Sequence, residues 1–155
     1  MGMKTAYIEL NATNQIHTLS EAQEKPSFIY KGITFYPNKS VTSLPEILHM
    51  NYRYFILDMG VLTTQNLPEF LRCDKSFLVC SPSKWRRSQI IEKIEHLFYY
   101  QQQNCISLIM NLTEKESTFT YFFKDYERFV FPYILNPFHL EPHNFHALSL
   151  LLKNL

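Results

Sequence analysis

Short apolar runs alternate with longer helical patterns along the 155 residues of this chain. This alternation is typical of β-α-β units, which build a mostly parallel sheet covered by helices. We therefore expect a single α/β domain over residues 1–155, with three layers, a mostly parallel sheet and helices on both faces, in a Rossmann-like arrangement. The expected strands are residues 5–10, 33–36, 54–57, 77–80, 105–110 and 128–131.

The run Tyr-Phe-Ile-Leu at residues 54–57 is the most strand-like of these segments. Continuous apolar runs are typical of strands that are buried on both faces of a parallel sheet. We expect the same burial here, with Asp58 at the carboxyl end of the strand.

Helices are expected where apolar residues recur every three or four positions. The first begins near Ser43, which is the expected N-cap, and Pro45 suits its first turn. Others are expected at residues 67–71, after a cap at residues 81–83, at residues 118–126 and at residues 142–153. The helix after residues 81–83 has an expected core stripe of Ile90, Ile91, Ile94, Leu97 and Phe98, and the last helix one of Phe145, Leu148, Leu151 and Leu152.

Glycine is scarce, since the chain contains only Gly2, Gly32 and Gly60. This excludes an internal P-loop of the form G-x-x-x-x-G-K-[ST] and the motif G-x-G-x-x-G. Both need closely spaced glycines so that backbone amides can surround a phosphate. We therefore expect no nucleotide phosphate to be held by such a loop in this segment.

Charge and cysteine content narrow the class further. The formal net charge of +1 argues against a dedicated nucleic-acid-binding protein, which would be strongly basic. No apolar run approaches the roughly 20 residues that span a bilayer, and the N-terminus lacks the apolar stretch of a signal peptide. Cys73, Cys80 and Cys105 are expected to be reduced thiols, so we expect a cytoplasmic protein.

Several polar residues fall at the carboxyl ends of the expected strands, where open α/β sheets bind ligands. Two acids on neighbouring strands could hold a metal ion or activate water. Acids and amides at strand ends also commonly cap loops and helices, and this second interpretation is favoured without further information. The residues concerned are Glu9, Asn11, Asp58, Ser81, Asn111 and Pro132.

The order of these segments resembles the ParA/MinD-type P-loop ATPases. The resemblance extends from Lys4 to nearly the end of the chain. It rests on Glu9-Leu10-Asn11, Asp58-Met59-Gly60, Ser81-Pro82-Ser83 and Ile109-Met110-Asn111, each of which follows or ends an apolar run. In that family the corresponding strands end in D-x-D, in the Walker B acid, in a small polar turn and in an asparagine that faces the base.

The resemblance implies roles for five residues, which we treat as vestigial nucleotide and magnesium positions. Glu9 stands at the first acid of D-x-D, which orients the attacking water, and Asn11 at the second. Asp58 stands at the Walker B acid, which holds magnesium through water. Asn111 stands at the adenine-facing position, and Pro132 lies in a loop that often lines the base.

The departures from the family pattern change the expected function. Glu9 and Asn11 replace two aspartates, and the P-loop strand with its lysine is absent from the sequence. Phosphoryl transfer depends on that loop, its lysine and magnesium. We therefore predict no ATP hydrolysis by this chain alone and no cofactor, and expect an interaction or regulatory module.

The alternative is an ATPase that binds Mg-ATP with a P-loop from an upstream segment or a partner chain. A flavodoxin-like or receiver-like sheet around Asp58 is a lower alternative.

The resemblance also implies a gap in the sheet. In the family the P-loop strand lies between the strand that ends at Asp58 and the strand at residues 77–80. An empty position there would leave backbone groups unpaired, which is costly. Either these two strands pair directly, or another segment fills the gap.

Two further groups are candidates for binding. Lys84, Trp85, Arg86 and Arg87 place three cations at the expected start of a helix, where they oppose the helix dipole. They are a candidate surface for an acidic partner, anionic lipid or phosphate, with a solvated helix start as the alternative. His139, His143, His146 and Glu141 could suggest zinc, but Pro142 interrupts their geometry, so no metal site is predicted. A protein partner or a homo-oligomer remains open.

Overall fold

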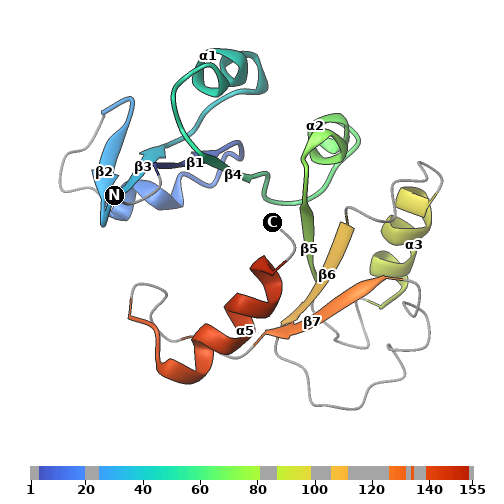
Figure 1. Ribbon diagram of the computed structural model, residues 1–155. Coiled ribbons are helices and arrows are strands. Elements are labelled where there is room, and N and C mark those ends of the chain that lie inside the picture. Colours follow the sequence, from blue (N-terminus) through green and yellow to red (C-terminus); the bar gives the residue numbers. More distant parts are fainter. Residues whose placement is uncertain are drawn as a thin grey trace. The chain divides into compact units, whose positions relative to one another are not determined.

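The computed structural model describes residues 4–19, 25–80, 87–98, 106–111, 126–131, 134 and 139–153. The chain divides into two compact units, Met1–Phe70 and Leu71–Leu155. Strands and helices alternate along it, as Figure 1 shows. The single domain over residues 1–155 stays a prediction.

The first unit contains a four-stranded mixed sheet in the order β2-β3-β1-β4. The central strand β1 (Thr5–Glu9) is parallel to β3 (Ile33–Tyr36) on one side and to β4 (Tyr54–Asp58) on the other. The short strand β2 (Phe28–Tyr30) is antiparallel to β3. The sequence predicted β1, β3 and β4 but not β2.

A tight turn explains the additional strand. Lys31 and Gly32, which join β2 to β3, have φ angles of 46° and 83°. Two successive positive φ angles characterise the two-residue turns that link antiparallel strands. Glycine adopts such an angle without steric cost, so Gly32 allows the chain to reverse here.

The core of the first unit lies between the sheet and α1 (Leu44–Leu48). Ala6 and Ile8 of β1 are fully buried on this face, and Leu44 and Ile47 of α1 pack against them. Side chains alternate between the faces of a strand, which is why every second residue of β1 points into this core. Each fully buried aliphatic side chain stabilises the fold by about 1.5–3 kcal/mol.

Two predictions for this unit were wrong. β4 is not buried on both faces, since Tyr54 and Ile56 are 37% and 47% exposed. The reason is that β4 ends its sheet, and only the side chains on its α1 face pack into the core. Ser43 does not cap α1 with its side chain; it ends the 3-10 helix η2 (Val41–Ser43), and its hydroxyl donates to the Ser40 carbonyl.

The second unit contains a parallel sheet in the order β5-β6-β7. Its strands are β5 (Ser76–Cys80), β6 (Ile106–Asn111) and β7 (Glu127–Phe131). They correspond to the strands predicted at residues 77–80, 105–110 and 128–131, of which residue 105 lies outside the described residues. Figure 1 shows α3 (Arg87–Phe98) and α5 (Pro142–Leu152) on opposite sides of this sheet. Among the described residues, the remaining helices are η1 (Gln15–Leu19) and α2 (Leu67–Arg72). The expected caps at residues 81–83 and all but the last residue of the helix expected at residues 118–126 lie outside the described residues.

Burial in the two long helices separates a correct prediction from a wrong one. In α3, Ile94 and Leu97 are almost completely buried, as the spacing predicted. In α5, Phe145 is 57% exposed while Asn144 is 3% exposed, so the predicted stripe was wrong at its start. The buried face begins one residue earlier, with Asn144 at the position that we had given to Phe145.

The two strands on either side of the expected gap belong to different sheets. β4 ends the first sheet and β5 begins the second, and neither pairs with the other in the described part of the chain. Both alternatives for the gap, direct pairing and a further segment, stay predictions.

Candidate functional site

The strand register brings the two predicted acids together. β1 and β4 are parallel, so their carboxyl ends lie at the same edge of the sheet, and Glu9 is directly opposite Asp58. Asn11 follows β1 by two residues and reaches the same place, because its amide donates to the Asp58 carbonyl at 3.2 Å. Three of the five residues singled out from the sequence therefore form one cluster.

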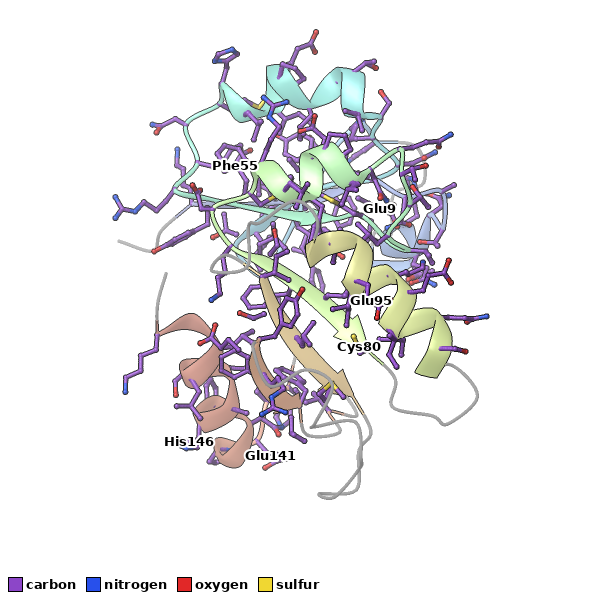
Figure 2. All side chains as sticks on the ribbon, turned by 90° about the vertical axis from the view of Figure 1, so that its right-hand side faces the viewer. Glu9, Phe55, Cys80, Glu95, Glu141 and His146 are labelled. Carbon is purple, nitrogen blue, oxygen red and sulfur yellow. The ribbon has the colours of Figure 1, made fainter. Side chains whose placement is uncertain are left out.

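Glu9 is fully buried, and its carboxylate is held by its own chain. One oxygen, Oε1, accepts the backbone N–H of Gln15 at 2.8 Å and the Thr13 hydroxyl at 3.5 Å. The other, Oε2, accepts the backbone N–H of Asn38 at 3.0 Å. Hydrogen bonds to a charged acceptor are stronger than those between neutral groups. Glu9 thus ties the loop after β1 to the loop after β3 (Figure 2).

Asp58 is partly buried and also accepts two hydrogen bonds. The Tyr7 hydroxyl donates to Oδ2 at 2.7 Å, and the backbone N–H of Gly60 donates to Oδ1 at 3.0 Å. Burial, the hydrogen bond to Asp58 and the negative charges of Asp58 and Glu9 all raise the pKa of Tyr7 well above its ordinary value. Tyr7 therefore remains a protonated donor to this carboxylate.

Asn11 and Gly60 fix the loops beside Asp58. The Asn11 side-chain oxygen accepts the backbone N–H of Thr13 at 3.0 Å and a short hydrogen bond from the Thr13 hydroxyl. Gly60 has a φ angle of 62°, and a Cβ atom at this position would lie 2.9 Å from the Cβ atom of Asn11. Only glycine fits here, because the backbone conformation and the close approach both exclude a side chain.

The sequence missed Tyr7, Thr13 and Asn38 as partners of the two acids. Tyr7 lies two residues before Glu9, so the alternation of a strand places both on one face, and this signal was present. Thr13 follows Asn11 closely, which is typical of a local side-chain turn. Asn38 was not predictable as a partner, because its contact depends on the pairing of β1 with β3.

The cluster does not fit the magnesium and nucleotide that the fold implies. Glu9 has no exposed surface, and both of its oxygens already accept hydrogen bonds. Within the described residues, neither Glu9 nor Asp58 forms an ion pair with a lysine or arginine that could also bind phosphate. Of the two acids, only Asp58 retains exposed surface for a ligand. As arranged, the hydrogen bonds of the cluster join the loops that follow β1, β3 and β4.

The other predicted residues are not part of this cluster. Asn111 is the last residue of β6 in the second unit, and its side chain is not among those described. Pro132 lies outside the described residues, as do Lys84, Trp85 and Arg86, while Arg87 begins α3. Their proposed roles stay predictions.

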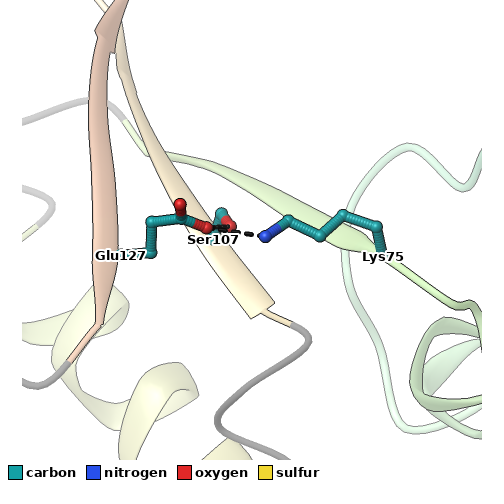
Figure 3. A network of polar contacts seen from close by, with 3 residues as sticks. All are labelled: Lys75, Ser107 and Glu127. Atoms are coloured by element: carbon teal, nitrogen blue, oxygen red, sulfur yellow. Dashed lines mark hydrogen bonds and ion pairs between the residues drawn. The ribbon is translucent and has the colours of Figure 1, made fainter. Parts of the chain in front are cut away.

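A second polar cluster lies at the amino ends of the strands of the second unit (Figure 3). Glu127, the first residue of β7, accepts hydrogen bonds at the same oxygen from Lys75 and from Ser107, both at 2.6 Å. Ser107 is fully buried, whereas the Glu127 side chain is 39% exposed. The sequence did not indicate this cluster, because its three members come from three different strands or their flanks.

The part of the chain that the structure describes contains no group of three or more His, Cys, Asp or Glu side chains that could hold a metal ion. Among the same residues, no helix has the length and apolar character needed to cross a bilayer.

Solved structures identify the class of fold. The chain is similar to a ParA family ATPase from Chlorobium tepidum TLS, with a TM-score of 0.57 and 13% identity, over 83% of this chain and 72% of that one. It is also similar to a chain of the MinC:MinD cell division protein complex from Aquifex aeolicus, with a TM-score of 0.59 and 15% identity, over 82% of this chain and 67% of that one. No family model matches the sequence, and no curated protein matches it either.

These similarities confirm the predicted fold. The chain has a ParA/MinD-like α/β fold, with parallel and mixed sheets and helices in three layers. Identities of 13% and 15% establish the fold alone, so activity has to be argued from the site.

Proposed function

We propose that this protein is a non-catalytic, degenerate ParA/MinD-like domain that acts as an interaction or regulatory module in the cytoplasm. The state of Glu9 carries the proposal. The resemblance gives this position to the acid that orients the attacking water. Here its carboxylate is fully buried, and each of its oxygens accepts a backbone N–H of the same chain. A carboxylate held in this way cannot turn toward a substrate.

Two further observations support a role in binding. The few glycines of the sequence include no phosphate-binding loop. The similar structure from Aquifex aeolicus is that of a complex between two proteins, MinC and MinD. By analogy of fold, we propose a protein as the partner of this chain.

Calorimetry with Mg-ATP tests the proposal. We expect no heat of binding from the full chain, because its sequence contains no P-loop motif with the accompanying lysine. Measurable binding that is lost in Asp58→Asn but kept in Asp74→Asn would overturn it. Asp74 is an exposed acid of the second unit and serves as the matched control.

The second candidate is an ATPase whose P-loop comes from an upstream segment or a partner chain. The partly exposed carboxylate of Asp58 favours it, because this acid remains at the position that the resemblance assigns to magnesium binding. This candidate predicts that Mg-ATP binds only when a segment with a G-K-[ST] loop is added in cis or in trans. If that addition produces no binding, this candidate fails while the first remains.

The basic segment at residues 84–87 is the proposed partner surface. Changing Lys84, Arg86 and Arg87 together to alanine removes three positive charges and leaves Trp85 in place. We expect weaker binding to an acidic partner and a reduced dependence of that binding on salt. Unchanged binding would remove this surface from the proposal.

A further inference from the structure

The outer edge of β4 is where the ParA/MinD resemblance expects the P-loop strand, which is absent from this sequence. β4 pairs with β1 alone in the described part of the chain, although its sequence, Tyr-Phe-Ile-Leu-Asp, is typical of an internal strand. Its exposed face carries Tyr54 and Ile56, which are 37% and 47% exposed. Apolar edge strands are templates for pairing with a further strand.

The hydrogen bonds between β4 and β1 show which backbone groups of β4 face β1 and which face the outer edge. The N–H of Tyr54 faces the Lys4 carbonyl, and the carbonyl of Asp58 accepts the N–H of Leu10 at 2.8 Å. Backbone groups of alternate residues point to the same side of a strand. The three residues at positions 54, 56 and 58 therefore direct their groups to β1.

Phe55 and Leu57 consequently direct their N–H and carbonyl groups to the outer edge. Their side chains pack into the core beneath α1, as Figure 2 shows for Phe55, so their backbones are held in place. The edge thus presents two donors and two acceptors in a fixed, extended arrangement.

We propose that this edge pairs with β4 of a second copy of the chain in an antiparallel, two-fold arrangement centred on Ile56. Antiparallel strands exchange both hydrogen bonds between residues whose groups face each other. A centre at Ile56 sets Phe55 opposite Leu57 of the copy and Leu57 opposite its Phe55. All the outward backbone groups of both edges are then paired by four hydrogen bonds.

Side chains and charges fit the same arrangement. At the centre, Ile56 meets Ile56 of the copy, and Tyr54 lies opposite Asp58 of the copy. Arg53 is exposed just before β4, and the partly exposed Asp58 ends this strand. Within the described residues, neither of these two groups forms an ion pair. Antiparallel pairing brings Arg53 of each chain beside Asp58 of the other.

The inference rests on the proposed role as an interaction module and specifies one partner as a second copy. The two are tested separately with the full chain. Heat of binding with Mg-ATP would overturn the proposed function, and absence of a dimer would overturn this inference while leaving the calorimetric result unchanged. The P-loop strand of the second candidate would occupy the same edge of β4, so its addition should dissociate the dimer.

Amide hydrogen exchange of the full chain tests the pairing residue by residue. The amides of Ile56 and Asp58 are bonded to β1 and should exchange slowly at every protein concentration. The amides of Phe55 and Leu57 should exchange fast at protein concentrations at which sedimentation shows a monomer. They should exchange at least about tenfold more slowly at concentrations at which sedimentation shows a mass twice as large. Fast exchange at all concentrations would overturn the inference. So would slow exchange that does not depend on concentration, because the edge would then be covered within one chain.

Substitution on the two-fold axis distinguishes this interface from other contacts. In Ile56→Lys each lysine faces the lysine of the copy, and directly opposed like charges are destabilising. We expect the dissociation constant of the dimer to rise at least about tenfold. The matched control is Ile29→Lys, which places a lysine at a 74% exposed isoleucine of β2 and should leave the dimer unchanged. A dimer lost in the control and kept in Ile56→Lys would assign the contact to β2 and overturn the proposal.

Discussion

Two glutamates at opposite ends of strands are held in different ways. In the first unit, Glu9 at a carboxyl end is fully buried and accepts backbone N–H groups from two loops. In the second unit, Glu127 at an amino end is 39% exposed and accepts side-chain donors from Lys75 and Ser107. The first is bound to the backbone of the fold and the second to the side chains of neighbouring strands.

This difference teaches how the ligand-binding edge of an α/β sheet can become structural. A backbone donor cannot be removed by mutation of its own residue, so the Glu9 carboxylate is tied to the path of the chain. A side-chain donor can be replaced, and an exposed ion pair is screened by salt. We therefore expect the two glutamates to differ in the size and the salt dependence of their contribution to stability.

The largest effect is expected at Glu9. Glu9→Ala leaves the backbone N–H groups of Gln15 and Asn38 without their carboxylate acceptor, and a hydrogen bond to a charged group contributes about 1.5–3 kcal/mol. We expect a loss of about 3 kcal/mol in the free energy of unfolding, measured by urea denaturation. Glu9→Gln keeps the size and shape of the side chain but turns an NH₂ group toward one of these donors, so it should cost nearly as much.

A Glu9→Gln variant as stable as the parent chain would contradict this account. It would mean that the carboxylate is not needed by the fold and is free for another role. That result would remove the observation on which the non-catalytic proposal rests.

A substitution in the backbone turn after Asp58 should cause the next largest loss in the free energy of unfolding. Gly60→Ala forces a side chain into a positive-φ conformation and against Asn11, so we expect a loss of about 2 kcal/mol in the free energy of unfolding. Gly32→Ala is the control, since its φ angle is also positive but nothing lies within 4 Å of the added Cβ atom. The control should lose only about 1 kcal/mol, and equal losses would show that the contact with Asn11 is unimportant.

Local pattern predicted most of the fold. The apolar runs located β1, β3, β4 and β5, and the helical spacing located the buried Ile94 and Leu97 of α3. The failures have tertiary causes. Whether β4 is an internal or an end strand depends on its neighbours, and a single residue of rotation decides whether Phe145 or Asn144 faces the core.

The sequence predicted which acids gather at the site, but it did not predict their hydrogen-bond partners. Glu9 and Asp58 were identified because strand ends meet at one edge, and the register confirms this. Their actual partners depend on loops: Asn38 reaches Glu9 only because β3 lies beside β1. The sequence therefore indicated where acids gather, and only the structure shows that each of them already has donors.

Glu127 should contribute less than Glu9 and in a different manner. Glu127→Gln removes the charge that Lys75 pairs with but keeps an oxygen acceptor for Ser107, so we expect a loss of about 1 kcal/mol in the free energy of unfolding. Raising the salt concentration to about 0.5 M should reduce this loss, because the pair is partly exposed. The loss in Glu9→Gln should not change with salt. If both variants respond equally to salt, the distinction between backbone and side-chain partners fails.

The smallest effect on the free energy of unfolding near neutral pH comes from two buried, weakly acidic side chains, one in each unit. Burial raises the pKa of the Cys80 thiol in the second unit from 9.0 to about 11. Burial, with a hydrogen bond to Tyr52, raises the pKa of Tyr36 in the first unit from 10.0 to about 12. In each case the unfolded chain releases its proton at a lower pH than the folded chain, so stability falls as pH rises between the two values.

The loss in the free energy of unfolding that is due to Cys80 should therefore begin about one pH unit below the loss that is due to Tyr36. At pH 9 the loss due to Cys80 amounts to only a few tenths of a kcal/mol, and it should level off near pH 11, where the thiol of the folded chain also ionises. Cys80→Ala should abolish the part of the decline between pH 9 and pH 11, and the smaller side chain adds a loss that does not depend on pH. Tyr36→Phe should instead flatten the decline between pH 10 and pH 12. Identical pH profiles for the parent chain and Cys80→Ala would show that the thiol is not protected from solvent, and the second unit would then be more open around β5 than the burial of Cys80 implies.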